Sequence, residues 1–107
     1  MQRRFKGFTV SDWEDIKRLN YRDKVAQSQE EAVYIAVMAG IDMSMVPLDY
    51  SFYSHCVNLT KKRQEFSKCV DDAAYRILYV KNELGLFDDP YPHAEDAGDV
   101  GLPESEL

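Results

Sequence analysis

Residues 28–40 constrain the fold most strongly, because they predict a helix that must be covered on most of its sides. Ser28 and Glu31 form a Ser-x-x-Glu capping box, and Gly40 stands where helices commonly end in a left-handed glycine. Between these two signals, apolar residues are spread around nearly the whole helix, among them Ala32, Val33, Ile35, Ala36, Val37 and Ala39. A helix that is apolar nearly all round belongs in a core. Other parts of the chain must therefore pack around it.

Two short segments on either side of this helix have the character of β-strands. Phe8–Val10 consists of aromatic and β-branched residues, and in Ile41–Val46 the odd-numbered positions are apolar until Pro47 ends the run. Because a helix and short connections separate them, a parallel strand–helix–strand crossover is favoured over a hairpin. We therefore expect an α/β fold in which these two strands run in the same direction.

Further helices are predicted before and after this unit. A second Ser-x-x-Glu box, formed by Ser11 and Glu14, predicts a helix with a modest apolar side, followed by a polar loop over residues 20–27. Another helix is expected to begin near Asp49 as its cap. The clearest amphipathic pattern covers residues 67–84. The fold is therefore expected to be helix-rich.

The chain changes character after Phe87. Residues 88–107 contain prolines and seven of the 19 acidic residues, and no Lys or Arg follows Lys81. These features predict an extended linker over 88–107 and a folded part over 1–87. Residues 1–87 hold 12 acids and 13 bases, so the body is almost neutral. A neutral body with an acidic tail gives no electrostatic reason to expect nucleic-acid binding.

The sequence gives no sign of a membrane partner. It contains no run of about 18 apolar residues of the kind that spans a bilayer. Its first six residues are basic but are not followed by the apolar stretch of a secretory signal. The sequence therefore assigns no compartment to the protein.

No cofactor or metal is expected from the residues that could bind one. Cys56 and Cys69 are thirteen positions apart and form no Cys-x-x-Cys pair, and His55 and His93 do not complete a zinc-ligand pattern. Two buried or half-buried free thiols are the favoured interpretation. A disulfide between the two cysteines remains open.

The chemistry-bearing candidates are Asp12 and Trp13, which follow the first predicted strand directly. Barrel enzymes place their catalytic groups at this end of a strand, and an indole offers a flat apolar face on which a sugar ring can rest. Asp12 could instead only complement the dipole of the following helix, and Trp13 could be an ordinary core aromatic. Asp42 could face an active centre, but an internal, hydrogen-bonded structural role is favoured for it.

Four stretches, in order along the chain, resemble motifs of glycoside hydrolase family 3, which contains the β-glucosidases. Residues 7–13, Gly-Phe-Thr-Val-Ser-Asp-Trp, resemble the nucleophile motif of that family. Residues 39–47 look like its last barrel strand, and residues 71–91 look like its closing helix and exit. Residues 100–105 are similar to its interdomain connector. The resemblance thus covers nearly the whole chain.

This resemblance implies retaining hydrolysis of a β-linked glucoside or a similar sugar on a (β/α)8 barrel. Asp12 would be the nucleophile, Trp13 would flank the sugar subsite, and no cofactor would be needed. Residues 1–87 would be the C-terminal portion of the barrel domain, holding about its last two βα units, and residues 88–107 the interdomain linker. The family's acid/base residue usually comes from the following domain. Members are often secreted or periplasmic.

A complete barrel takes roughly 250 residues, so we expect a chain of 107 residues to be a fragment that is inactive alone. Two alternatives remain: an interaction module that self-associates or binds a full-length partner through exposed edges, and a small helical protein without glycosidase ancestry. Helical or antiparallel Phe8–Val10 and Ile41–Val46 would favour the last. An Asp12 buried against aliphatic groups, or on the N-terminal rim of its sheet, would exclude a glycosidase.

Overall fold

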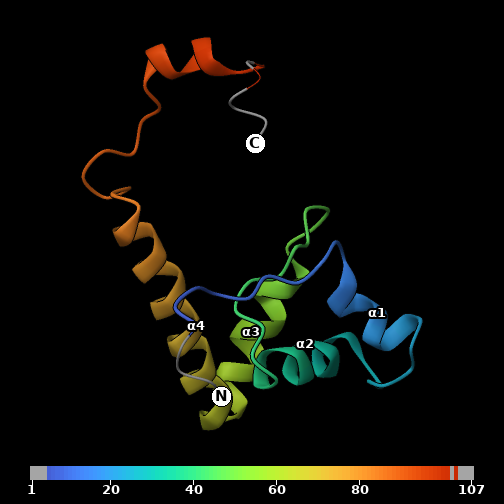
Figure 1. Ribbon diagram of the computed structural model, residues 1–107. Helices are drawn as coiled ribbons and strands as arrows, with labels where there is room; N and C mark the ends of the chain where they lie inside the picture. Colours follow the sequence, from blue (N-terminus) through green and yellow to red (C-terminus); the bar gives the residue numbers. More distant parts are fainter. Residues whose placement is uncertain (1–4, 102, 104–107) are drawn as a thin grey trace.

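Four α-helices form the body of the protein in a computed structural model, which describes residues 5–101 and 103. The helices are α1 (Asp15–Tyr21), α2 (Gln29–Met38), α3 (Ser51–Lys62) and α4 (Gln64–Glu83). Helix α2 contacts each of the other three, and α3 and α4 also contact each other (Figure 1). The expected helix-rich fold is thus confirmed, with α2 as its central element.

Small side chains on α2 allow the other helices to approach it closely. Four of its residues are buried, namely Ala32, Val33, Ala36 and Val37. Ile16 from α1, Ala26, Leu59 from α3 and Phe66 from α4 join them in this core, and Phe66 is fully buried. The Phe66 ring stacks on that of Tyr34 with a centroid separation of 6.0 Å. The prediction that this helix is covered on most sides is confirmed.

The two ends of α2 follow the signals in the sequence. The Glu31 amide donates a hydrogen bond of 3.1 Å to the Ser28 hydroxyl. The Glu31 carboxylate accepts from the amide of Gln27 at 2.7 Å, one residue earlier than a standard capping box would place it. After the helix, Gly40 has a φ of 115°, which strains any residue with a Cβ.

The predicted strands Phe8–Val10 and Ile41–Val46 are reduced to a single bridge between Val10 and Met43, and no strand is formed within residues 5–101. This corrects the expectation of an α/β fold with two full strands. Within the described residues, each segment has only the other to pair with as a strand, and two short strands are marginal without further strands beside them. The bridge is parallel, however, so the expected relative direction is confirmed.

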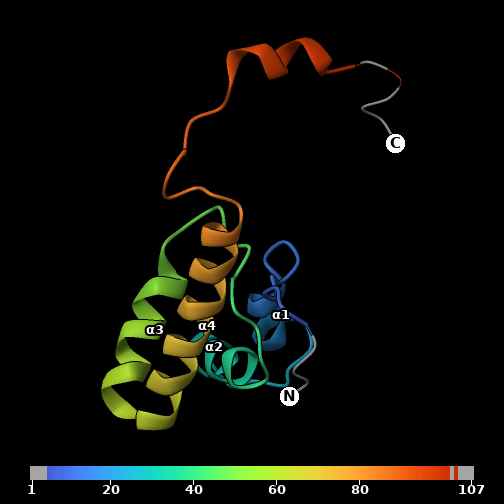
Figure 2. The same cartoon turned by 60° about the vertical axis from the view of Figure 1, so that its left-hand side comes forward.

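Helices α3 and α4 form a hairpin in which a single residue, Arg63, separates them (Figure 2). The N-cap of α3 is Tyr50, so the expectation that Asp49 caps this helix is wrong, although the Asp49 carboxylate accepts from the amide of Ser51 at 2.9 Å. Helix α4 begins at Gln64, three residues earlier than the amphipathic pattern predicts. Among the described helices, none is both long and apolar enough to cross a bilayer.

The segment after α4 leads away from the four helices (Figures 1 and 2). Residues 88–101 are all exposed, and a short 3-10 helix, Ala94–Asp99, forms within them. The segment is therefore not extended throughout. A linker over residues 88–107 and a domain boundary at residue 87 stay predictions, and residues 102 and 104–107 lie outside the described part.

Replacing Phe66 with alanine is expected to lower the free energy of unfolding by about 3–5 kcal/mol, because it empties the centre of the core. Urea denaturation followed by circular dichroism measures this loss. Leu78→Ala on the same helix is the control: its side chain is half-exposed, so it should cost less than about 1 kcal/mol. Equal losses for the two variants would contradict this assignment of the core.

Candidate active site

Backbone hydrogen bonds join residues 9–11 to residues 42–43. The carbonyl of Thr9 accepts from the amides of Asp42 and Met43 at 2.9 and 3.1 Å. The Ser11 amide donates to the Met43 carbonyl at 2.9 Å. These bonds fix the register of the two segments, so the chain leaves the parallel bridge at Ser11 and continues into Asp12.

Ser11 extends this pairing with its side chain. The residue is buried, and its Oγ accepts a hydrogen bond of 2.9 Å from the Met45 amide. The same hydroxyl lies 3.2 Å from the Asp12 carbonyl oxygen, to which it donates. The predicted capping box of Ser11 and Glu14 is therefore wrong, because a donor 34 residues away engages the hydroxyl.

Glu14 ends the short loop that contains Asp12 and Trp13. Its amide donates to the carbonyl of Met45 at 2.8 Å, and its φ is 56°, a left-handed value that costs energy for a residue with a side chain. Helix α1 begins only after it, at Asp15. Asp12 thus precedes the helix, which begins later than the capping box of Ser11 and Glu14 predicts.

The Asp12 side chain is accessible. The residue is exposed, and its Oδ1 accepts a hydrogen bond of 2.8 Å from the amide of Trp13. It lines an open depression of about 530 Å³ together with residues that include Leu19, Arg22 and Ile41. The side chain is neither buried against aliphatic groups nor placed before the bridge, so neither condition that would exclude a glycosidase is met.

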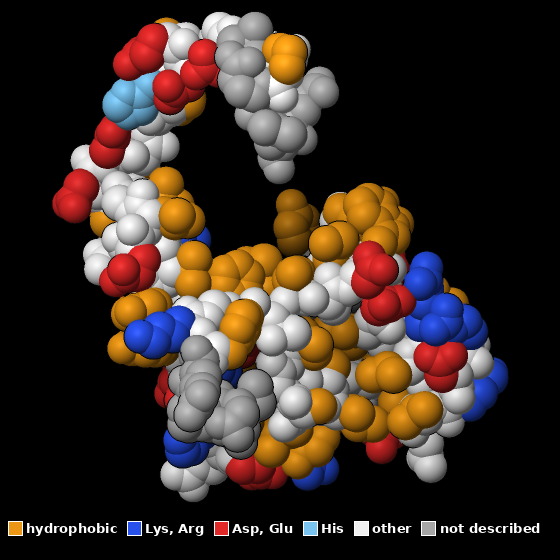
Figure 3. All heavy atoms as spheres, viewed as in Figure 1, with side chains coloured by type: hydrophobic (Ala, Val, Ile, Leu, Met, Phe, Trp, Pro, Cys, Tyr) orange, Lys and Arg blue, Asp and Glu red, His pale blue; other side chains and the backbone are white. Residues whose placement is uncertain are grey.

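Trp13 is 51% exposed, so it is not a core residue in this structure. It is one of several apolar side chains open to solvent beside the bridge. Figure 3 shows hydrophobic side chains at many places on the face that is also seen in Figure 1. An exposed indole next to an exposed carboxylate leaves room for a ligand at both groups.

The other acids near Asp12 are paired with cations. Glu14 Oε1 lies 3.1 Å from Lys17 Nζ, and the same ammonium lies 2.6 Å from Asp49. The bonds from Lys17 and Ser51 hold the pKa of Asp49 below its usual range, and Asp49 raises that of Lys17. Asp15 pairs with Arg18 at 2.7 Å. Both acids next to this loop are therefore already engaged by cations.

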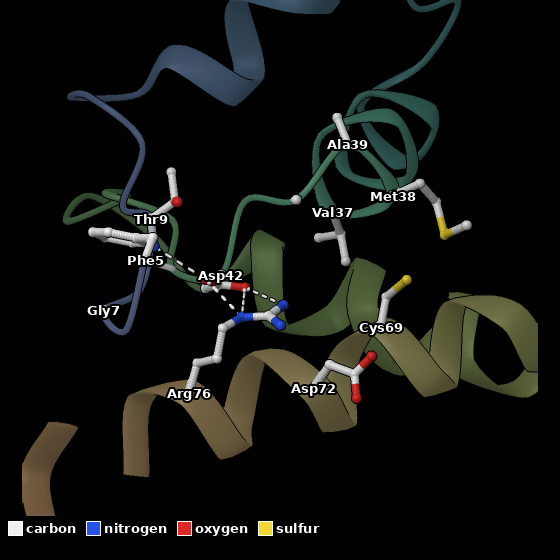
Figure 4. Close-up of a pocket in the computed structure, with 11 residues that line it drawn as sticks. Phe5, Gly7, Thr9, Val37, Met38, Ala39, Asp42, Cys69, Asp72 and Arg76 are labelled. Carbon is white, nitrogen blue, oxygen red and sulfur yellow. Dashed lines mark hydrogen bonds and ion pairs between the residues drawn. The ribbon is translucent and has the colours of Figure 1, made fainter. Parts of the chain in front are cut away.

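Asp42 is held by α4 and by the first segment of the chain (Figure 4). Its side chain is only 3% exposed, and Arg76 binds both carboxylate oxygens at 2.8–3.1 Å. The amide of Thr9 donates to the same carboxylate at 3.0 Å. Asp42 in turn raises the pKa of Arg76. The favoured interpretation of Asp42 as an internal structural acid agrees with these contacts.

Sequence reasoning missed Arg76. The available signal was weak: a cation one turn after the buried Ala73 on an amphipathic helix that also carries Lys68 and Lys81. Beside the pair is a cavity of about 490 Å³, also lined by Cys69 and Asp72. Figure 4 shows the Arg76 and Asp42 side chains pointing toward each other at this cavity.

The two cysteines are free and half-buried, as expected. Burial raises the pKa of the Cys56 thiol to about 11, so the thiolate that would act as a nucleophile is scarce at neutral pH. No cluster of three or more metal-binding side chains is found within residues 5–101.

Comparison with known proteins identifies a family. The family model described as "Glycosyl hydrolase family 3 N terminal domain" matches residues 1–80. This description names an N-terminal domain, whereas the sequence resemblance suggested the C-terminal portion of the barrel domain, and this is the one detail that differs. The alternative of a helical protein without glycosidase ancestry is overturned by the match.

Individual relatives agree with the family match. The lysosomal beta glucosidase of Dictyostelium discoideum is 44% identical over 93 residues, covering 87% of this chain and 11% of that protein. The periplasmic beta-glucosidase of Salmonella typhimurium is 44% identical over 89 residues, covering 83% and 11%. A putative beta-xylosidase of Formosa agariphila is 41% identical over 92 residues, covering 86% and 12%. The chain spans only about a tenth of the length of these relatives.

Arg76→Met is expected to destabilise the protein more than Asp42→Asn. The first variant strands a carboxylate that is 3% exposed, whereas the second leaves a guanidinium that is 41% exposed and reaches water. We expect losses of about 1.5–3 kcal/mol and about 1 kcal/mol, respectively. Thermal and urea unfolding measure both. The double variant should lose less than Arg76→Met alone, and the opposite order of the single variants would contradict this account.

Proposed function

Because the chain belongs to glycoside hydrolase family 3, we propose that it carries the nucleophile segment of a retaining, β-glucosidase-like hydrolase. The observation that carries the proposal is the exposed Asp12, which has no cation partner within residues 5–101 and lies in a two-residue loop fixed at both ends. A nucleophile must be accessible and held in place, and Asp12 meets both requirements.

In the proposed reaction, the amide of Trp13 holds Asp12 Oδ1 and leaves Oδ2 to attack the anomeric carbon. The glycosidic C–O bond breaks as a second carboxyl group protonates the leaving oxygen. That group then takes a proton from water, which cleaves the glycosyl ester and releases the sugar and a free Asp12 carboxylate. The exposed Trp13 ring would stack on the sugar.

The second carboxyl group is proposed to come from outside this stretch. A retaining enzyme needs it about 5–5.5 Å from the nucleophile and protonated. Glu14 and Asp15 are the closest acids along the chain, and each is engaged by a cation, Glu14 by Lys17 at 3.1 Å and Asp15 by Arg18 at 2.7 Å. Neither is therefore proposed as the second carboxyl group.

For the fold, we propose that residues 1–87 form about the last two βα units of a (β/α)8 barrel and that residues 88–107 form an interdomain linker. The parallel bridge between Val10 and Met43, with α2 in the intervening chain, supports this arrangement. A barrel of roughly 250 residues requires many more strands. We therefore propose that the isolated chain does not hydrolyse glycosides.

The nucleophile is tested by grafting this chain into the Salmonella typhimurium periplasmic beta-glucosidase in place of its aligned stretch. An aryl 2-deoxy-2-fluoro-β-glucoside should leave its sugar bound covalently to Asp12, because the fluorine slows breakdown of the ester. Peptide mapping by mass spectrometry locates the label. Asp12→Asn should lower kcat by about a thousandfold or more.

Asp23→Asn is the matched control, because Asp23 is also an exposed aspartate, and its carboxylate pairs with Arg22 at 2.8 Å. Its effect on kcat should stay within about threefold, as for a surface substitution away from the chemistry. If the fluorosugar labelled another residue of an active chimera, the assignment of Asp12 as the nucleophile would be refuted. Turnover of an aryl β-glucoside by purified 1–107, abolished by Asp12→Ala, would refute the inactivity of the isolated chain.

A second candidate function is self-association or binding of a full-length partner as an interaction module. The observation that favours it is the exposure of large apolar side chains on and after the bridge: Val10, Trp13, Met43, Met45, Leu48, Tyr50 and Tyr53. Contiguous apolar surface commonly marks an interface. Sedimentation velocity of purified 1–107 tests this function, since a stable oligomer of defined size supports it and a monomer at all concentrations speaks against it.

A further inference from the structure

The hydroxyl of Ser11 connects the two segments at the residue just before Asp12. It accepts the Met45 amide at 2.9 Å and donates to the carbonyl oxygen of Asp12 at 3.2 Å. One buried oxygen thus links a backbone group of the neighbouring segment to the peptide of the residue proposed as nucleophile. A hydroxyl has one proton and two lone pairs, so it can make both bonds at once.

The loop is attached at its other end to the same residue. The Glu14 amide donates to the Met45 carbonyl at 2.8 Å. Asp12 and Trp13 therefore lie between two attachments that both use the backbone of Met45. The attachment after the loop is backbone to backbone, whereas the one next to Asp12 also depends on a side chain, which a substitution can remove.

We propose that Ser11 is a positioning residue for Asp12; this inference rests on the proposed function. Without the hydroxyl, the Met45 amide and the Asp12 carbonyl both lose a partner, and the peptide that carries the Asp12 carboxylate is held less firmly. Reacting atoms must come within about 3–3.5 Å of each other, and a displacement of about 1 Å costs about a hundredfold in rate. Ser11 thus acts through Asp12 and does not touch the substrate.

The test uses the chimera described above, carrying Ser11→Ala, Ser11→Thr or Ser44→Ala. Ser44 is the matched control, because its Oγ is also buried but has no hydrogen-bond partner within the described residues. Ser11→Ala should lower kcat by about 10- to 100-fold with little change in KM. Ser11→Thr keeps the hydroxyl, and Ser44→Ala removes a hydroxyl that makes no hydrogen bond within the described residues. The kcat of both variants should therefore stay within about threefold of that of the unsubstituted chimera.

A second background separates positioning from mere stability. In Asp12→Gly, added azide replaces the carboxylate: it attacks the anomeric carbon, the aryloxide leaves, and the product is a glycosyl azide of inverted configuration. The Asp12→Gly variant has no carboxylate, so a residue whose role is to position that carboxylate should have no effect in it. Ser11→Ala should therefore change the azide-dependent rate by less than about threefold, as expected when two residues act as one unit.

The exchange of the Met45 amide with solvent, followed by NMR on the chain 1–107, gives a reading that does not depend on activity. Ser11→Ala should accelerate this exchange, and Ser44→Ala should not. An unchanged exchange rate of the Met45 amide in Ser11→Ala overturns the proposal. The proposal is also overturned if Ser11→Ala lowers the rate equally in the chimera with Asp12 and in the azide-rescued Asp12→Gly chimera, while the fluorosugar still labels Asp12. A folded chimera that neither turns over nor labels Asp12 overturns the proposed function, and this inference falls with it.

Discussion

The covering of α2 is the constraint on which the rest of the structure depends. Its four buried residues are alanines and valines, so α1, α3 and α4 can approach close to its axis. Because α2 is packed against these three helices, the positions of its two ends are fixed, and so are the segments that lead into it and out of it. The segments before α1 and after α2 consequently lie side by side in the same direction, which is the geometry of the bridge between Val10 and Met43.

The candidate site is built on this pairing and owes its shape mainly to the backbone. Amides and carbonyls of Met43 and Met45 hold the chain on both sides of Asp12, and Ser11 adds one side-chain oxygen. On the opposite side of the bridge, the buried carboxylate of Asp42 holds the amide of Thr9. Fixed groups of this kind need no reorganisation when a reaction begins, which is what a catalytic carboxylate requires of its surroundings.

Signals that act within one helix were predictable from the sequence. Ser28 caps α2 and Gly40 follows its end as expected, because the groups involved are a few residues apart. Ser11 and Glu14 have the same Ser-x-x-Glu pattern, but the capping box predicted from it is not formed. The Ser11 hydroxyl found a backbone donor 34 residues away, and no local pattern reports such a competitor. The contact of Arg76 with Asp42 was invisible for the same reason, since it joins residues also 34 apart.

The extent of the two strands was overestimated, because a pattern of apolar residues indicates only a preference for the strand conformation. A β-ladder also needs a neighbouring strand with which its backbone can form hydrogen bonds. The family and the candidate nucleophile, in contrast, followed from short stretches whose order along the chain is informative.

The double attachment at Met45 bears on how this stretch can vary. Both attachments use its peptide groups, and its thioether plays no part in them. The position should accept many side chains in related sequences while excluding proline, which has no amide hydrogen to offer. Residue 45 could then be apolar, polar or charged in related sequences, provided that it has a backbone N–H group.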